Sequence, residues 1–111
     1  MYKISFYTPK DKLSPISKFL DSCSDRLRAK IVKQLKYVEE FGLTPAIPNI
    51  KKIITTPLWE LRILGKDNIR IFCIGLPGKE IKILNIFAKK KQKTPHKEIA
   101  KALRRNSDLD K

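Results

Sequence analysis

The chain has 111 residues and a formal net charge of +14, from 25 Lys and Arg residues against 11 Asp and Glu residues. A chain of this length buries one hydrophobic core, and a hydrophobic content of 41% is too high for a disordered polymer, so we expect one globular domain over residues 1–111. Residues 51–111 carry +10 of the charge, which exceeds the need of an enzyme for a neutral metabolite and favours a polyanionic partner such as nucleic acid.

Membrane, secretion and metal patterns are missing from the sequence. No stretch approaches the roughly 20 apolar residues of a membrane-spanning helix. Residues 1–6 lack the apolar segment of a secretion signal. Cys23 and Cys73 form no Cys-x-x-Cys arrangement, and a single histidine supplies no metal-ligand set. We therefore expect a cytoplasmic protein with no membrane partner, no metal and no cofactor.

The N-terminal half predicts a strand followed by two helices. Residues 2–7 alternate apolar and polar side chains, which is typical of a half-buried strand. Ser14 precedes a proline and should cap a short helix, and Ser24 should cap a second helix that ends at Gly42. The basic residues expected on the outer face of the second helix are Arg26, Arg28, Lys30, Lys33 and Lys36. We expect a helical hairpin on one face of a sheet.

The C-terminal half predicts three strands and a final helix. The strands cover residues 58–64, 69–74 and 80–87, and their short connections require an antiparallel meander in which the last strand is central. Thr94, followed by a proline, should cap a helix that ends near Arg105, with the remaining residues frayed.

The hairpin between the first two of these strands decides where Arg62 and Arg70 point. If Leu64 pairs with Ile69, the arginines lie on opposite faces of the sheet. A loop one residue longer pairs Leu64 with Arg70 and brings the arginines to one face. A functional site built on both arginines therefore predicts a bulge or a three-residue turn near residues 65–68.

Three motifs carry a family resemblance. They are Leu-Trp-Glu-Leu-Arg at 58–62, Ile-Arg-Ile-Phe at 69–72, and Phe-Ala-Lys-Lys-Lys-Gln-Lys-Thr-Pro at 87–95. Together with the order of elements, they resemble the RelE/ParE toxin superfamily and, within it, the HigB-type branch of phage-derived Gp49-like proteins. The resemblance implies an α+β RelE-like fold, with an N-terminal strand and helical hairpin packed on an antiparallel-rich sheet and a short C-terminal helix.

The resemblance also implies a function. We expect the toxin of a type II toxin–antitoxin system, a ribosome-dependent endoribonuclease that cuts messenger RNA without a metal, through the ribose 2′-hydroxyl. Its partners would be the ribosome, messenger RNA and a HigA-type antitoxin with a helix-turn-helix domain. Two alternatives remain open: a ParE-like inhibitor of DNA gyrase on the same scaffold, and an RNA- or ribosome-binding module without catalysis.

Cleavage through the 2′-hydroxyl needs a base, an acid and cations around the phosphorus. The candidate catalytic residues are Arg62, Arg70, Lys90, Lys91 and His96. The candidate RNA or phosphate contacts are Lys66, Lys89, Lys93, Gln92 and Phe87. Many RelE-type proteins carry a C-terminal tyrosine as a candidate base, whereas the tyrosines here are Tyr2, Tyr7 and Tyr37. Glu60 lies on the same strand face as Arg62, as a further candidate base or as an ion-pair partner of a nearby cation.

Overall fold

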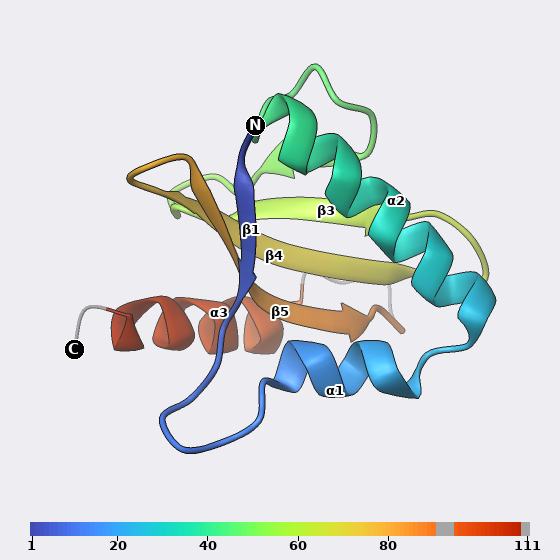
Figure 1. The fold of residues 1–111 in the computed structure, drawn as a ribbon, viewed down its shortest axis with the longest axis horizontal. Helices are drawn as coiled ribbons and strands as arrows, with labels where there is room; N and C mark the ends of the chain where they lie inside the picture. The colour runs from blue at the N-terminus through green and yellow to red at the C-terminus, as the bar shows by residue number, and fades with distance from the viewer. Residues whose placement is uncertain (91–94, 110–111) are drawn as a thin grey trace.

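A mixed sheet of five strands lies between two layers of helix in the computed structural model, which describes residues 1–90 and 95–109 (Figure 1). The strands are β1 (Lys3–Phe6), β2 (Ile50–Lys52), β3 (Trp59–Ile63), β4 (Ile69–Leu76) and β5 (Glu80–Ala88). The helices are α1 (Pro15–Ser22), α2 (Asp25–Phe41) and α3 (His96–Asp108). The expected α+β class, with a helical hairpin, an antiparallel-rich sheet and a C-terminal helix, is confirmed.

The strand order is β1-β5-β4-β3-β2, so β5 is an inner strand, as predicted. β1 runs parallel to β5, and the other neighbouring pairs are antiparallel. The sequence analysis missed β2, an edge strand of three residues that is too short to show a period of two. β2 matters for the site because it places Lys51 opposite Glu60 of β3.

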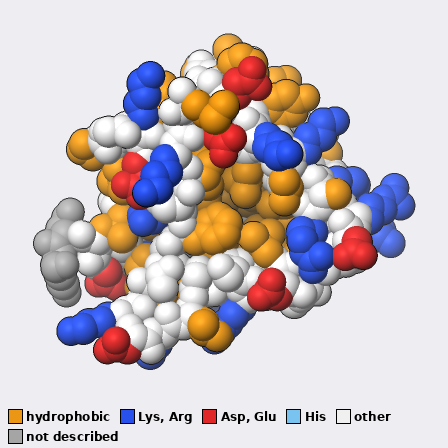
Figure 2. All heavy atoms as spheres, in the orientation of Figure 1, with side chains coloured by type: hydrophobic (Ala, Val, Ile, Leu, Met, Phe, Trp, Pro, Cys, Tyr) orange, Lys and Arg blue, Asp and Glu red, His pale blue; other side chains and the backbone are white. Residues whose placement is uncertain are grey.

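The two faces of the sheet bury different core clusters. Leu61, Ile71 and Ile83 face α1 and α2 on one side. Phe72 and Phe87 face α3 on the other, with their ring centroids 5.1 Å apart in an edge-to-face arrangement. Figure 2 shows the first of these faces, where hydrophobic side chains gather in the centre between α1, α2 and β1 and basic side chains lie over α2.

Local capping signals begin and end the helical hairpin where the sequence predicts. The hydroxyl of Ser14 accepts from the first amides of α1, and the hydroxyl of Ser24 accepts from the amide of Leu27 in α2. Gly42 ends α2 with φ of +80°. A side chain there would also collide with Tyr2, because a Cβ atom on Gly42 would lie 2.6 Å from the Tyr2 ring.

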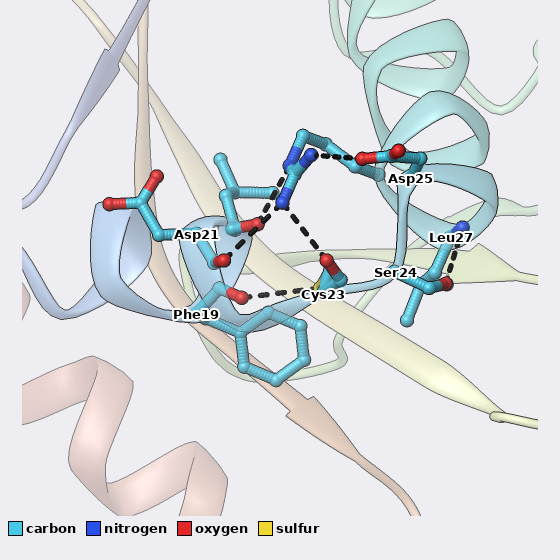
Figure 3. A network of polar contacts seen from close by, with 8 residues as sticks. Phe19, Asp21, Cys23, Ser24, Asp25 and Leu27 are labelled. Atoms are coloured by element: carbon cyan, nitrogen blue, oxygen red, sulfur yellow. Dashed lines mark hydrogen bonds and ion pairs between the residues drawn. The ribbon is translucent and has the colours of Figure 1, made fainter.

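Arg28 does not face outward as expected but folds back over the end of α1. Its guanidinium donates to three carbonyl oxygens, those of Leu20 at 2.8 Å, Cys23 at 2.9 Å and Asp21 at 3.3 Å (Figure 3). It also donates to the carboxylate oxygen Oδ1 of Asp25 at 2.9 Å. The last carbonyls of a helix have no partner within the helix, and a five-donor guanidinium can satisfy several of them at once. Arg28 therefore connects the first turn of α2 to the end of α1.

α3 differs from the prediction at both ends. It begins at His96, with Pro95 in the N-cap position and no side-chain cap bond, while Thr94 lies outside the described residues. It extends to Asp108 rather than ending near Arg105, because the hydroxyl of Tyr7 donates to Asp108 Oδ2 at 3.2 Å. Arg105 contributes a second tie through its bond to the Leu84 carbonyl at 2.8 Å. Within the described residues, no helix has the length and apolar character needed to cross a membrane.

Candidate functional site

Arg62 of β3 and Arg70 of β4 are paired directly across the sheet, so both side chains lie on one face. The common face that a site built on both arginines requires is therefore found, but in a register that differs from both alternatives considered from sequence. Ile63 pairs with Ile69, which leaves a connection of five residues, 64–68, rather than a three-residue turn or a bulge. By strand alternation this is the face covered by α3, because Arg70 alternates with Ile71 and shares a face with Phe72.

A buried carboxylate lies between the two arginines. Glu60 is 6% exposed, and its Oε1 accepts from Nε of Arg62 at 3.0 Å. Its Oε2 lies 3.9 Å from Nε of Arg70, and Nζ of Lys51 lies 3.9 Å from Oε1. Like charges directly opposite each other destabilise a strand pair, and a buried carboxylate is costly without cations. The two arginines and Glu60 therefore stabilise one another.

The two arginines differ in what they offer to a ligand. The Arg62 side chain is 38% exposed and uses Nε for Glu60, so part of its guanidinium is open to solvent. The Arg70 side chain is only 10% exposed. Burial lowers the pKa of Arg70, the charge of Glu60 opposes that shift, and the charge of Arg62 adds to it. Its Nε atom is buried and donates no hydrogen bond to any residue that the structure describes.

Asn68 connects this arginine pair to the lysine-rich junction, the run of residues 89–93 that follows β5. Its Oδ1 accepts from Nη1 of Arg70 at 2.7 Å, and its Nδ2 donates to the carbonyl oxygen of Lys89 at 2.6 Å. The amide of Lys89 in turn donates to the carbonyl oxygen of Asn68 at 2.9 Å. Asn68 has φ of +50°, a left-handed conformation that asparagine tolerates better than most residues. These bonds hold the start of the junction beside Arg70.

The structure places the other predicted residues at different points. Lys90 is exposed directly after Lys89, and His96 is exposed at the first turn of α3. No contact among the described residues joins His96 to the arginine pair. Phe87 pairs with Arg70 in the register of β4 and β5, but it is only 8% exposed, so a base could stack on its ring only if that ring left the core. Lys91, Gln92 and Lys93 lie outside the described residues.

Lys66 lies in the connection between β3 and β4 and lines a groove next to α2. Arg26 and Lys30 line the same groove. A second groove along α2 is lined by Lys30, Lys33, Tyr37 and Arg62, among others. Arg62 borders this groove from β3, but its side chain lies on the sheet face covered by α3, so the basic residues of α2 and the arginine pair lie on opposite faces of the sheet.

Sequence reasoning missed two members of this cluster, Asn68 and Lys51. The sequence places Asn68 in the predicted turn, and an asparagine two residues before a strand arginine offers that arginine an acceptor and a neighbouring carbonyl a donor. Lys51 joins the cluster through β2, which had no sequence signal. The described residues include no group of three or more His, Cys, Asp or Glu side chains placed to hold a metal ion.

Comparison with known proteins gives one family match and several similar folds. Residues 18–107 match the family described as "Phage derived protein Gp49-like". A variant of the E. coli toxin RelE with two arginines changed to alanine, solved in the free state, aligns with a TM-score of 0.66 at 16% identity over 94% of this chain and 96% of that chain. No curated protein sequence matches.

Two structures of the YoeB–YefM complex from Staphylococcus aureus are also similar in fold. The first has a TM-score of 0.58 at 20% identity and covers 81% of this chain and 99% of that chain. The second, described as a heterotetrameric toxin–antitoxin complex, has a TM-score of 0.54 at 20% identity and covers 84% and 99%. At these identities the likeness establishes the fold, and the expected RelE-like architecture is confirmed.

Proposed function

The chain belongs to the phage-derived Gp49-like family and has the RelE fold, and from this premise we propose that it is the toxin of a type II toxin–antitoxin system that cuts messenger RNA on the ribosome. We assign it to the HigB-type branch and to the cytoplasm, where ribosomes translate. The observation that carries the proposal is the direct pairing of Arg62 with Arg70, joined through Asn68 to Lys89.

The reaction we propose is an attack within the RNA chain. A base takes the proton of the ribose 2′-hydroxyl, the 2′-oxygen bonds to the adjacent phosphorus, and the bond from phosphorus to the 5′-oxygen breaks. The 5′-oxygen then takes a proton, which leaves a 2′,3′-cyclic phosphate and a 5′-hydroxyl. Negative charge builds on the phosphoryl oxygens during the attack, and preorganised cations stabilise it.

The cationic side chains near the arginine pair could stabilise the negative charge that builds on the phosphoryl oxygens. Arg62 and Arg70 present guanidinium groups, which match phosphate geometry through paired donors. Lys89 and Lys90, with Lys91 and Lys93 further along, would bind flanking phosphates, and one of these lysines would assist the leaving oxygen. We assign proton transfer to His96, because an imidazole ring can both accept and donate a proton. Gln92 would contact the RNA as a neutral donor.

The basic surface also suits an antitoxin partner. The neighbouring S. aureus structures are complexes of YoeB with YefM, the second described as toxin–antitoxin. By analogy, we propose that a HigA-type antitoxin with a helix-turn-helix domain covers the arginine pair or wraps beside it. A net charge of +14 favours an acidic segment as the inhibitory part of that partner.

Primer extension on messenger RNA in a translating extract tests the function. Wild-type protein should give cuts spaced by codons, and Arg70→Ala should abolish them. Arg104→Ala, which removes an exposed arginine on α3, should keep them. Intact messenger RNA with wild-type protein would refute the nuclease, and inhibition of DNA gyrase by the same protein would then establish the ParE-like alternative.

A further inference from the structure

Glu60 is a buried carboxylate in a place where the core does not need one. Its side chain is 7% exposed, and two residues close to it in sequence, Leu58 and Leu61, are fully buried hydrophobic residues. Burial of an ion pair brings little stability compared with apolar packing, because desolvation offsets most of the attraction. A role in arranging the two arginines would explain why a carboxylate with this desolvation cost lies here.

The geometry argues against Glu60 as the base. A general base must come within about 3 Å of the proton's parent oxygen. The Oε1 atom of Glu60 is engaged by Arg62 at 3.0 Å with Lys51 at 3.9 Å, and Oε2 faces Nε of Arg70 at 3.9 Å. Both oxygens are therefore directed at cations in a buried position, where a 2′-hydroxyl has little access.

We propose that Glu60 is a positioning residue that accepts a hydrogen bond from Nε of Arg62 and attracts the charge of Arg70 from 3.9 Å, so that both guanidinium groups meet the scissile phosphate in a fixed orientation. The inference rests on the proposed function for the identity of that phosphate. Glu60 has a second effect through its charge. It offsets part of the positive potential of the two arginines, so it weakens the binding of any phosphate while improving the alignment of the reacting one.

Neutralising Glu60 should separate these two effects. Glu60→Gln keeps the shape of the side chain but removes the charge. The affinity for RNA should rise about fivefold, because one competing negative charge is gone from beside the phosphate. The cleavage rate of bound RNA should fall about 100-fold, because a small misplacement of the arginines costs that much in rate. Loss of a purely structural residue would lower both quantities.

The experiment measures both quantities on the same variants. Affinity is measured on ribosomes carrying messenger RNA with a 2′-deoxy nucleotide at the cleavage position, which cannot react, and the rate is measured on the matching ribonucleotide. The matched control is Glu80→Gln, since Glu80 is a sheet carboxylate of β5 paired with Lys82 at 3.4 Å and bonded to Ser5. The control should change neither quantity. Unchanged or weaker RNA binding by Glu60→Gln would overturn the proposal, as would an unchanged rate.

Glu60→Asp provides a second variant that keeps the charge but shortens the reach. It should slow cleavage without raising affinity, and a rise equal to that of Glu60→Gln would overturn the proposal. If Glu60→Gln unfolds below the assay temperature, the cleavage rate and RNA affinity of Glu60→Asp test the proposal instead.

Arginine Nε–H signals in NMR test the positioning without any cleavage. Wild-type protein should show a slowly exchanging Nε–H signal for Arg62, and Glu60→Gln should show faster exchange, because a neutral amide oxygen accepts a weaker hydrogen bond than a carboxylate. An equally protected signal in Glu60→Gln would refute the positioning role. If wild-type protein cuts no messenger RNA, the proposed function fails while this NMR comparison still decides the role of Glu60.

Discussion

Asn68 and Lys89 are joined by two reciprocal hydrogen bonds, from Asn68 Nδ2 to the Lys89 carbonyl at 2.6 Å and from the Lys89 amide to the Asn68 carbonyl at 2.9 Å. The pair connects the turn after β3 to the end of β5. It also orients Arg70, which donates to the same asparagine side chain.

Changing the Asn68 side chain should therefore lower the stability of the fold. Asn68→Gly keeps the left-handed backbone but removes both side-chain bonds, and it should lower the free energy of unfolding by about 2 kcal/mol. Asn68→Asp keeps the acceptor for Arg70 but places a carboxylate oxygen against the Lys89 carbonyl, so it should also destabilise the fold. Urea denaturation measures both. Wild-type stability in Asn68→Asp would show that the bond to Lys89 contributes nothing.

Charge alone should not replace the Arg70 guanidinium. Arg70→Lys keeps the charge but cannot donate to Asn68 and face Glu60 at once, so we expect cleavage to fall about 100-fold. Arg62→Lys should lose less, about tenfold, because Arg62 is more exposed and donates one bond to Glu60. Single-turnover cleavage on programmed ribosomes measures both, with thermal melting as a check on folding. Full activity in Arg70→Lys would mean that only the positive charge is required.

Arg28 should matter for stability and not for chemistry. Arg28→Ala removes the bonds to the carbonyls at the end of α1, and we expect a loss of about 2 kcal/mol in the free energy of unfolding. Arg28→Lys should recover only part of it, because an ammonium group lacks the guanidinium fork. Arg26→Ala, an exposed neighbour on the same helix, should leave stability unchanged. A loss of cleavage in Arg28→Ala well below its melting temperature would contradict a purely structural role.

Tyr7 should make the protein less stable at high pH. Burial, followed by the hydrogen bond and charge of Asp108, raises the pKa of Tyr7 above its ordinary value of 10.0. The folded chain then holds the Tyr7 proton more tightly than the unfolded chain. The contribution of Tyr7 to the free energy of unfolding is therefore fully present below pH 10 and is lost as the pH rises through the pKa of the folded state.

Unfolding measured from pH 9 to about pH 11 should show a shallower decline for Tyr7→Phe than for wild type. Tyr37→Phe, which changes a tyrosine that is 43% exposed, should keep the wild-type slope. Equal slopes for wild type and Tyr7→Phe would show that another group controls this decline.

Local signals predicted the ends of the two helices in the hairpin. The features that the sequence did not predict depend on contacts between residues far apart in the chain. Ser14, Ser24 and Gly42 act on backbone groups within one turn of themselves, so their sequence context is enough. The prediction that Arg28 faces outward was wrong. Its partners are carbonyl oxygens at the end of the preceding helix, which the local sequence does not reveal. α3 extends past Arg105 because its last turn is held by Tyr7, a residue from the other end of the chain.

The candidate site was predicted in its residue types but not in its arrangement. The sequence left open whether Arg62 and Arg70 share a face, because their direct pairing follows from a five-residue connection whose register no local pattern reveals. Lys51 was missed because β2 is recognisable only by its pairing with β3. The buried position of Phe87 likewise depends on its contact with Phe72 across the sheet.

The parallel pairing of β1 with β5 sets the order in which a newly made chain can finish its fold. Lys3 lies opposite Glu80, so the first strand to be synthesised has its partner in the last one. Contacts between such distant segments form slowly, because a long loop must close before they stabilise anything. β5 also leads into Lys89, which is bonded to Asn68. A chain whose β5 has not yet emerged from the ribosome therefore carries both arginines on an incomplete sheet, and Lys89 reaches Asn68 only after β5 has joined β4.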